Sequence, residues 1–365
     1  MRILHVVTLI SPDRAYGGPV TVALNQAVEL TRRGHEVTVC AATRGYEVVP
    51  TERSGVDLRL FPAIQLIPKA GFAGLTSVGL IRWVYAHLDS FDVVHVHLAR
   101  DLVTMPIARL ASLRSKRVLS QTHGMILPDS RFVARVFDRF LTRPVLRSVA
   151  VALCLNQREV EAVQQVDGSD LRCVELPNGV AFVDMRISTA SESREILFVG
   201  RLQKRKNAPV FVAAAKLLIG QGSTARFTLV GPDEGDGPGI REAIRGEHQI
   251  QWIGALEPDQ VLDKLREAAV YVLPAVDEPF PMTVLEAMAV GLPVVITRSC
   301  GLAGLVTVHD AGLVVDPTPR DVADAIDELL DDPERARDMG TRGRSAVRSR
   351  LSIETVAAEL IDLYR

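Results

Sequence analysis

The chain has 365 residues, of which 47% are hydrophobic, 24% charged and 5% aromatic, so we expect a soluble globular protein with two domains rather than one. Its many Val, Leu and Ala residues favour the α/β class, in which buried parallel strands are covered by helices. The 42 basic and 44 acidic residues give a formal net charge of −2, which excludes a global positive field and argues against a nucleic-acid partner.

Short β-branched runs alternate with helical patterns from the start of the chain. The apolar run 3–9 is interrupted by His5 and is followed by no small-residue cleavage site, so it predicts a first strand and not a signal peptide. A helix over about 19–33, ended by Gly34, and a strand over 36–41 complete a β-α-β unit. Further strands are predicted over 93–98, 118–121 and 149–155.

A polar stretch without periodicity over 182–194 predicts a linker between a first domain, 1–181, and a second domain, 195–350. The second domain repeats the alternation, with strands over 195–199, 226–230, 251–253, 270–274 and 293–297 and helices over 208–219, 258–268 and 282–290. The last segment, 351–365, has the length of a helix that crosses to the first domain. Two successive parallel-sheet domains follow, with ligands expected beyond the carboxyl ends of their strands.

The strongest local signal is a segment with two glutamates. Glu278 lies on a loop with two prolines, and Glu286 lies on the short helix that follows. Eight residues of continuous helix would separate them by about 12 Å, which is too far to act on one atom but suits the two ends of an extended ligand. The N–H groups at the helix start, at Met282 and Thr283, would face a diphosphate. The alternative is that Glu286 only caps or solvates the helix.

A basic loop follows the strand over 195–199 and opens the next helix. Arg201 and Lys206 place positive charge where the diphosphate of a bound nucleotide would lie. Such charge stabilises a leaving nucleoside diphosphate. The alternative is a solvated basic loop, which we expect for Lys204 and Arg205.

Glycine and histidine motifs add weaker signals. Gly17 and Gly18 follow the first strand and would let the backbone approach a phosphate or sugar closely, although such pairs also occur in ordinary turns. No G-x-G-x-x-G follows that strand, and no P-loop motif occurs, which weakens dehydrogenase and P-loop interpretations. His95 and His97 face one side of a strand, but no third ligand is apparent nearby. With four distant cysteines and no C-x-x-C pair, we predict no metal site.

Seven stretches, in order and across nearly the whole chain, resemble the GT-B glycosyltransferases with an E-x7-E motif, the large retaining group called family 4. They are Tyr16-Gly17-Gly18-Pro19, Asp92-Val93-Val94-His95-Val96-His97, Thr122-His123-Gly124, Leu176-Pro177-Asn178-Gly179-Val180, Phe198-Val199-Gly200-Arg201-Leu202 with Lys206, Leu229-Val230-Gly231, and the two-glutamate segment. Each stretch is weak by itself, but accidental agreement of all seven is improbable.

The resemblance implies the GT-B fold, with two Rossmann-like domains facing across a central cleft. It implies transfer of a sugar from a nucleoside diphosphate sugar to a hydroxyl with retention of configuration, without a metal or other cofactor. Arg201 and Lys206 would hold the diphosphate, Glu286 the ribose and Glu278 the sugar, and His123 would orient the sugar near the reacting centre. The other expected donor-binding residues are Gly17, Gly18, Gly231, Phe280, Met282 and Thr283.

The sequence departs from the family pattern at Asn207 and Pro281, where relatives often have glycine, and this affects the choice of donor more than the reaction class. The acceptor is expected to be a glycan, lipid-linked or small-molecule hydroxyl in cell-surface polysaccharide or glycolipid synthesis. Two other functions are open: a nucleotide-sugar epimerase or phosphorylase of similar architecture, and a non-catalytic sugar-nucleotide-binding protein.

A basic stripe predicts contact with a membrane surface. Arginines recur every fourth residue between 131 and 147, at Arg131, Arg135, Arg139, Arg143 and Arg147. Apolar residues lie between them and in the stretch 64–84, which suits an interfacial helix on anionic lipid. A core-facing helix with solvated arginines is the alternative. No uncharged apolar run reaches the roughly 18–20 residues that span a bilayer, so we expect a cytoplasmic protein, peripheral on the inner face of the membrane.

Overall fold

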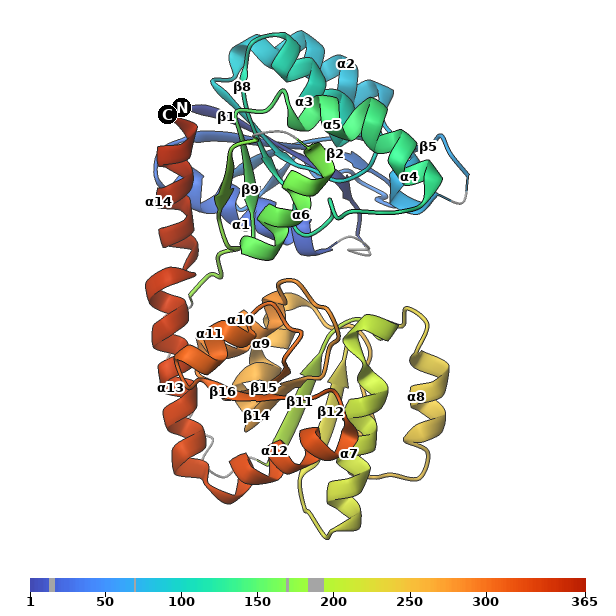
Figure 1. Cartoon of the computed structure of the whole chain (residues 1–365), viewed down its shortest axis with the longest axis vertical. Helices are drawn as coiled ribbons and strands as arrows, with labels where there is room; N and C mark the ends of the chain where they lie inside the picture. Colours follow the sequence, from blue (N-terminus) through green and yellow to red (C-terminus); the bar gives the residue numbers. More distant parts are fainter. Residues whose placement is uncertain (13–16, 69, 169–170, 183–193) are drawn as a thin grey trace. The chain divides into compact units, whose positions relative to one another are not determined.

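The computed structural model describes residues 1–12, 17–68, 70–168, 171–182 and 194–365 (Figure 1). The chain divides into two compact units: unit 1 is Met1–Ala181 with Ile353–Arg365, and unit 2 is Phe182–Ser352. The predicted linker over 182–194 lies almost entirely outside the described residues. Each unit is a largely parallel sheet covered by helices, which confirms the predicted α/β class with two Rossmann-like domains.

Unit 1 contains an eight-stranded sheet in the order β10-β9-β8-β7-β1-β2-β4-β3, in which only β3 is antiparallel. Its strands are β1 (Arg2–Ile10), β2 (Glu36–Thr43), β3 (Glu52–Arg53), β4 (Val56–Pro62), β7 (Val93–His97), β8 (Arg117–Gln121), β9 (Val151–Cys154) and β10 (Cys173–Glu175), and a separate hairpin pairs β5 (Ile64–Gln65) with β6 (Leu75–Thr76). Its helices are α1 (Gly17–Arg32), α2 (Val78–His87), α3 (Thr104–Leu113), α4 (Phe132–Phe137), α5 (Arg143–Leu146), α6 (Gln157–Asp167) and α14 (Ile353–Tyr364).

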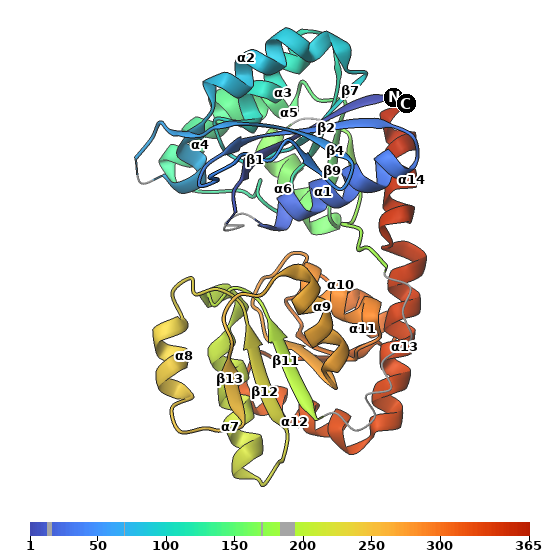
Figure 2. The same ribbon diagram turned by 180° about the vertical axis from the view of Figure 1, so that it is seen from behind.

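The two faces of this sheet carry separate apolar cores, because successive strand residues point to opposite sides. Leu4 and Val6 of β1 pack with residues of α2, α3, α5 and α6. Ile3 and Val7 pack on the other face with α1 and α14, the latter contributing Leu360 and Tyr364. The C-terminal helix therefore completes the core of unit 1, and both chain ends lie together there in either view (Figures 1 and 2).

Unit 2 contains a six-stranded sheet in the order β13-β12-β11-β14-β15-β16, parallel throughout. Its strands are β11 (Glu195–Val199), β12 (Arg226–Val230), β13 (Ile250–Trp252), β14 (Val270–Leu273), β15 (Val294–Thr297) and β16 (Gly312–Val315). Its helices are α7 (Ala208–Gly220), α8 (Gly237–Ala243), α9 (Pro258–Glu267), α10 (Met282–Val290), α11 (Ala303–Val308), α12 (Pro319–Asp331) and α13 (Pro333–Arg350). This 3-2-1-4-5-6 order is that of a Rossmann fold, whose ligands bind where the order reverses, between β11 and β14.

Sequence periodicity located the strands on which the sites depend, with ends shifted by one or two residues. It did not predict β4, β16 or the helices α2, α3, α6, α8 and α11. No helix in the described ranges is long and apolar enough to cross a membrane.

Candidate functional site

Loops after three adjacent strands form the candidate site of unit 2, at the point where the strand order reverses. Asn207, at the end of the β11 loop, donates from Nδ2 to the Pro274 carbonyl oxygen at 3.0 Å. The amide of Val276, in the β14 loop, donates to the Arg205 carbonyl oxygen at 2.9 Å. The amide of Gly301, after β15, donates to the Glu278 carbonyl oxygen at 2.8 Å. These three hydrogen bonds, one from a side chain and two from backbone amides, hold the loops in one fixed arrangement.

Glu278 is the centre of this arrangement. Its carboxylate lies 3.0 Å from Lys206 Nζ and 3.2 Å from Arg205 Nε. The Glu278 and Lys206 side chains are only 9% and 12% exposed, so the pair is largely removed from water. Burial lowers the pKa of Lys206, and Glu278 opposes that shift. Arg205 is exposed as predicted, with 46% of its side chain accessible, but it also shares this carboxylate.

Arg201 lies on the same loop but has a different partner. Its guanidinium pairs with Glu234 at 3.0 Å, and both side chains are partly exposed. Glu234 follows β12 and was not singled out from the sequence, because the pairing joins two loops that are distant in the chain. The structure therefore holds Arg201 and Lys206 at one sheet edge, each already paired with a carboxylate.

The short helix α10 carries the second glutamate. Glu286 is half-buried, and burial raises its pKa to about 7. Thr283, in the first turn, has its Oγ1 2.6 Å from the Tyr271 hydroxyl, which also donates to the Val199 carbonyl oxygen at 3.1 Å. Phe280 and Met282 are half-buried beside the helix start. Tyr271 thus fixes the first turn to the central strand β11, a contact that sequence reasoning missed.

Packing requires glycine at one of two predicted donor-site positions and not at the other. Gly231 has φ +144°, and a Cβ there would overlap the carbonyl oxygen of Gly200. The close approach of the β11 and β12 loops therefore requires glycine at Gly231, whatever the ligand. Gly18, by contrast, starts α1 beside Gly17, and a Cβ on it would meet no atom within 4 Å. Packing within the described residues does not explain glycine at Gly18.

His123 occupies the turn after β8 in unit 1. It adopts φ +50°, a left-handed conformation that is uncommon for residues other than glycine. The buried Glu159 carboxylate holds this turn, since it accepts from the Thr122 hydroxyl, from the Gly124 amide and, at 2.7 Å, from the Leu155 amide. Burial lowers the pKa of His123 to about 3, so the imidazole is neutral at physiological pH.

Three further histidines lie behind His123. His5 on β1 stands opposite His95 on β7 in the sheet register, and His97 follows two residues later. The ring nitrogens of these three side chains lie within 4.8 Å of one another and form a group of a size that can hold a metal ion. His5 is the third member of this group, which the sequence did not reveal. The absence of a metal site stays a prediction.

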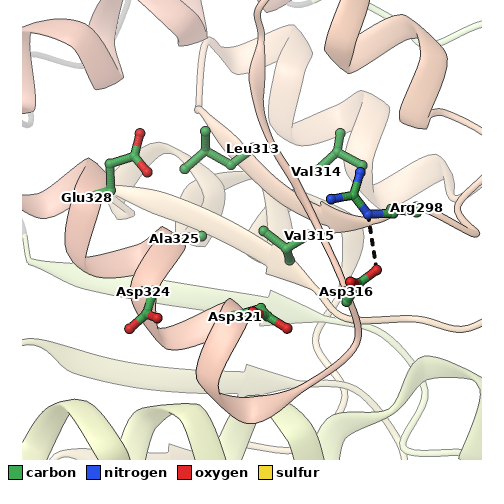
Figure 3. Close-up of a pocket in the computed structure, with 9 residues that line it drawn as sticks. All are labelled: Arg298, Leu313, Val314, Val315, Asp316, Asp321, Asp324, Ala325 and Glu328. Carbon is green, nitrogen blue, oxygen red and sulfur yellow. Dashed lines mark hydrogen bonds and ion pairs between the residues drawn. The ribbon is translucent and has the colours of Figure 1, made fainter.

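An acidic pocket of about 260 Å³ lies apart from these loops, between β16 and α12 (Figure 3). Its carboxylates are Asp316, Asp321, Asp324 and Glu328. Each has a protein partner, namely Arg298, Thr318, Arg320 and Arg335, respectively. We therefore assign no ligand to this pocket.

The arginines predicted as a stripe over 131–147 come from α4, α5 and the π-helical turn Asp138–Thr142 between them. Arg135, Arg139 and Arg143 line one pocket. Three of the five arginines bind within the protein: Arg131 to Asp129, Arg143 to the Val166 carbonyl oxygen, and Arg147 to Asp167. Arg135 and Arg139 form no ion pair with any described residue.

The surface of α4 and the π-helical turn is nevertheless strongly apolar. Phe132, Val133 and Phe140 are 79%, 78% and 68% exposed. Arg135 and Arg139 line a pocket of about 450 Å³ with Phe132. We call these five residues the α4 surface. The β5 hairpin, which carries the exposed Ile64, lies beside α4 in both views (Figures 1 and 2).

Comparison with known proteins agrees with this architecture. Residues 17–179 match the glycosyl transferase 4-like domain, and residues 184–346 match the glycosyl transferases group 1 family. The D-inositol 3-phosphate glycosyltransferase of Acidothermus cellulolyticus is 30% identical over 100% of this chain and 89% of its own. The enzyme of the same name from Thermobispora bispora is 32% identical over 75% and 70%.

Solved structures share the fold at low sequence identity. Sucrose-phosphate synthase from Thermosynechococcus elongatus superposes with a TM-score of 0.77 at 19% identity, over 100% of this chain and 98% of that one. HepE of Anabaena, solved with UDP and glucose, gives 0.78 at 16%, over 100% and 99%. Fold and relatives together define a glycosyltransferase enzyme with the GT-B fold. Within that class, the chain belongs to the glycosyl transferases group 1 family.

Proposed function

We propose that this enzyme transfers a sugar from a nucleoside diphosphate sugar to an acceptor hydroxyl with retention of the anomeric configuration. The observation that carries the proposal is the cluster of Arg201, Lys206 and Glu278 where the strand order of unit 2 reverses, since this is where Rossmann folds bind nucleotides. The solved complex of HepE with UDP and glucose supports a donor of this kind. We expect a glycan or lipid-linked acceptor in polysaccharide or glycolipid synthesis.

On binding, the diphosphate would replace Glu234 and Glu278 as the partner of the two cations. Its oxygens would take the places of Glu234 and Glu278 on Arg201 and Lys206, so that both cations face the departing charge without a metal ion. Glu278, released from Lys206, would accept from sugar hydroxyls. This exchange keeps Arg201 and Lys206 paired in the free and the bound protein, which a largely buried lysine requires.

The remaining donor contacts follow from the neighbouring backbone. The first amides of α10, at Met282 and Thr283, would donate to the diphosphate, as helix N-termini do. Glu286 would bind the ribose, and its pKa of about 7 lets it act as donor or acceptor near neutral pH. His123 would contact the sugar. The diphosphate and base of the donor would lie along Gly17, Gly18, Gly231 and Phe280.

A matched pair of lysine variants tests the role of Lys206. Lys206→Met should weaken nucleoside diphosphate binding about ten- to a hundredfold, because a hydrogen bond to a charged group contributes about 1.5–3 kcal/mol. Lys204→Met removes the same charge from the exposed side of the same turn and should change binding little. Calorimetric titration with UDP, GDP and ADP measures both. Equal affinities for the two variants would contradict the assignment, as would failure of the wild type to bind any of the three nucleotides.

Product analysis tests the reaction. Incubation with the UDP-, GDP- or ADP-sugar that binds, with and without a hydroxyl acceptor, should give an acceptor-dependent glycoside with the anomeric configuration of the donor. An inverted product would overturn the retaining mechanism. A changed nucleotide sugar formed without acceptor would indicate an epimerase instead.

We propose in addition that the α4 surface binds the cytoplasmic face of an anionic membrane. Exposed aromatic residues beside two arginines without ion pairs among the described residues suit the boundary between head groups and acyl chains. Phe132→Ser should reduce co-sedimentation with vesicles rich in phosphatidylglycerol about tenfold, since burying a phenylalanine contributes about 1.5 kcal/mol or more. Val308→Ser, at an equally exposed apolar position of unit 2, is the control. Equal losses, or no vesicle binding at low salt, would refute the proposal.

A further inference from the structure

Three arginines from consecutive segments line one pocket of unit 1. The pocket has a volume of about 450 Å³, and its arginines are Arg135 of α4, Arg139 of the π-helical turn and Arg143 of α5. We call it the arginine pocket. Arg143 donates from Nε to the Val166 carbonyl oxygen at 2.8 Å. None of the three guanidinium groups forms an ion pair with a residue that the structure describes.

The two carboxylates of the arginine pocket are already neutralised from outside it. Asp138 accepts from Arg100 Nε at 2.8 Å and from Arg100 Nη2 at 2.9 Å. Asp129 accepts from Arg131 Nε and Nη2, and this pairing lowers the pKa of Asp129 to about 2. Neither Arg100 nor Arg131 lines the pocket. Three positive charges are therefore left without a carboxylate from the described part of the chain, and they attract an anion.

A phosphate group suits these charges. Guanidinium groups bind phosphate oxygens through pairs of parallel hydrogen bonds, and their planar shape matches phosphate geometry. The Nε bond holds Arg143 in place, and its two terminal nitrogens form no hydrogen bond with a described residue. A volume of about 450 Å³ is within the range of small-molecule sites. The arginine pocket can therefore hold a phosphate together with part of the molecule that carries it.

The rest of the arginine pocket is partly apolar. Phe132 and Val136 of α4 and Val166 of α6 also line it. Phe132 is 79% exposed and belongs to the α4 surface, which includes the exposed Val133 and Phe140. An anion in the pocket would thus lie next to apolar side chains that are open to solvent. This combination fits a phosphate attached to an apolar chain, because the chain would cover those side chains.

The loop after β8 connects the arginine pocket to His123. Pro128 and Asp129 of this loop line the pocket and follow His123 by five and six residues. Arg100, which comes after β7, holds the loop because its Nη2 donates to the Leu127 carbonyl oxygen at 2.6 Å. The parallel strands β7 and β8 end at the same edge of the unit 1 sheet, the edge at which open α/β sheets bind ligands.

We propose that the arginine pocket binds the phosphate group of an amphiphilic acceptor, in which a lipid chain is joined through phosphate to the part that receives the sugar. This inference rests on the glycosyltransferase function proposed above and narrows its acceptor to a phosphorylated lipid. It differs from adsorption of the α4 surface to a membrane, because the pocket should bind a single soluble molecule in the absence of any bilayer.

Titration with monomeric octyl phosphate tests the pocket without a membrane or any activity. The wild type should bind one molecule, and more tightly than inorganic phosphate, which lacks the chain, or octyl glucoside, which lacks the charge. Arg139→Gln should weaken octyl phosphate binding about ten- to a hundredfold, the effect of losing a hydrogen bond to a charged group. Arg109→Gln is the matched control, since it removes the same charge from an exposed position on α3, and should change the affinity little.

Three results of this titration would overturn the proposal: no binding of octyl phosphate to the wild type, equal affinity for inorganic phosphate, or equal weakening by the two arginine substitutions. A further variant separates the pocket from the α4 surface. Val133 is 78% exposed but does not line the pocket. Val133→Ser should therefore reduce co-sedimentation with vesicles and leave octyl phosphate binding unchanged. A parallel loss of octyl phosphate binding would assign that binding to the apolar surface and overturn the pocket.

Inhibition tests the role of the pocket in the reaction. With the donor and acceptor found by product analysis, octyl phosphate should inhibit sugar transfer competitively with the acceptor and not with the donor. Arg139→Gln should raise the inhibition constant about tenfold or more. Inhibition that is not competitive with the acceptor would overturn the acceptor role. If the wild type bound no nucleotide, the proposed function would fall, whereas the octyl phosphate titration would still decide whether the pocket binds phosphate.

Discussion

Lowering the pH from 7.0 to 5.5 should destabilise unit 1. His5 and His123 have pKa values of about 3 in the folded protein against an ordinary 6.5. The unfolded chain therefore binds more protons over this interval, and stability falls as the pH drops below about 6.5. Each of the two histidines costs about 1 kcal/mol. Asp101, whose pKa burial raises to about 6, works in the opposite direction and offsets somewhat less than one of them.

The net loss from these three groups is about 1–2 kcal/mol. His95 and His97, whose pKa values burial also lowers, add to it. Unit 2 should behave in the opposite way. Glu286 has its pKa raised to about 7 from 4.5, so the folded state binds more protons than the unfolded one. Acidification from pH 7.0 to 5.5 should therefore stabilise unit 2 by about 1–2 kcal/mol.

The two tryptophans of the chain allow each unit to be followed separately. Trp83 lies on α2 of unit 1, and Trp252 lies on β13 of unit 2. Urea unfolding of Trp252→Phe, followed by the fluorescence of Trp83, should show the decrease at pH 5.5, and Trp83→Phe should show the increase. His5→Asn should reduce the loss in unit 1 by about 1 kcal/mol. Equal stability of unit 1 at both pH values, or an unchanged loss in His5→Asn, would refute the reasoning.

A pair of glycine substitutions separates packing from ligand binding, and a third substitution tests the support of the His123 turn. Gly231→Ala places a Cβ against the Gly200 carbonyl oxygen and should lower the free energy of unfolding of unit 2, measured in urea, by about 1–3 kcal/mol. Gly18→Ala should leave the stability of unit 1 unchanged and reduce donor affinity. A Gly231→Ala protein of unchanged stability would contradict the structural role of Gly231. Glu159→Gln weakens the hydrogen bonds from the Gly124 amide and its neighbours and should cost about 1.5–3 kcal/mol, so a smaller loss in the same urea assay would show that the charge is not needed.

Local patterns were sufficient for the fold class and for much of the unit 2 site. Buried parallel strands have short apolar runs in the sequence, and helices begin and end at characteristic residues. The ends of β11, β14 and α10 were therefore predicted to within one or two residues. Arg201, Lys206 and Glu278 follow those strands directly. Because the carboxyl ends of parallel strands meet at one sheet edge, these residues were expected together before any contact was known.

Such patterns could not predict which groups these residues bind. Arg205 was expected to be solvated but binds Glu278, because the β11 and β14 loops meet only when their strands lie side by side. The arginines were expected on an interfacial helix or solvated, yet Arg131 binds Asp129, Arg143 binds the Val166 carbonyl oxygen and Arg147 binds Asp167. Neither outcome is encoded in residue spacing.

The sequence by itself determined the class of fold, the order of the elements and the residues that carry charge at the strand ends, because periodicity and capping are local. Only the tertiary structure decided which of these groups are paired, buried or neutral. His5 and His97 are 92 residues apart in sequence, and His95 and Tyr364 are 269 apart. Hydrogen bonds over such separations exist only once β1, β7 and α14 have assembled, since burial and long-range hydrogen bonding are properties of the packed molecule and not of any segment.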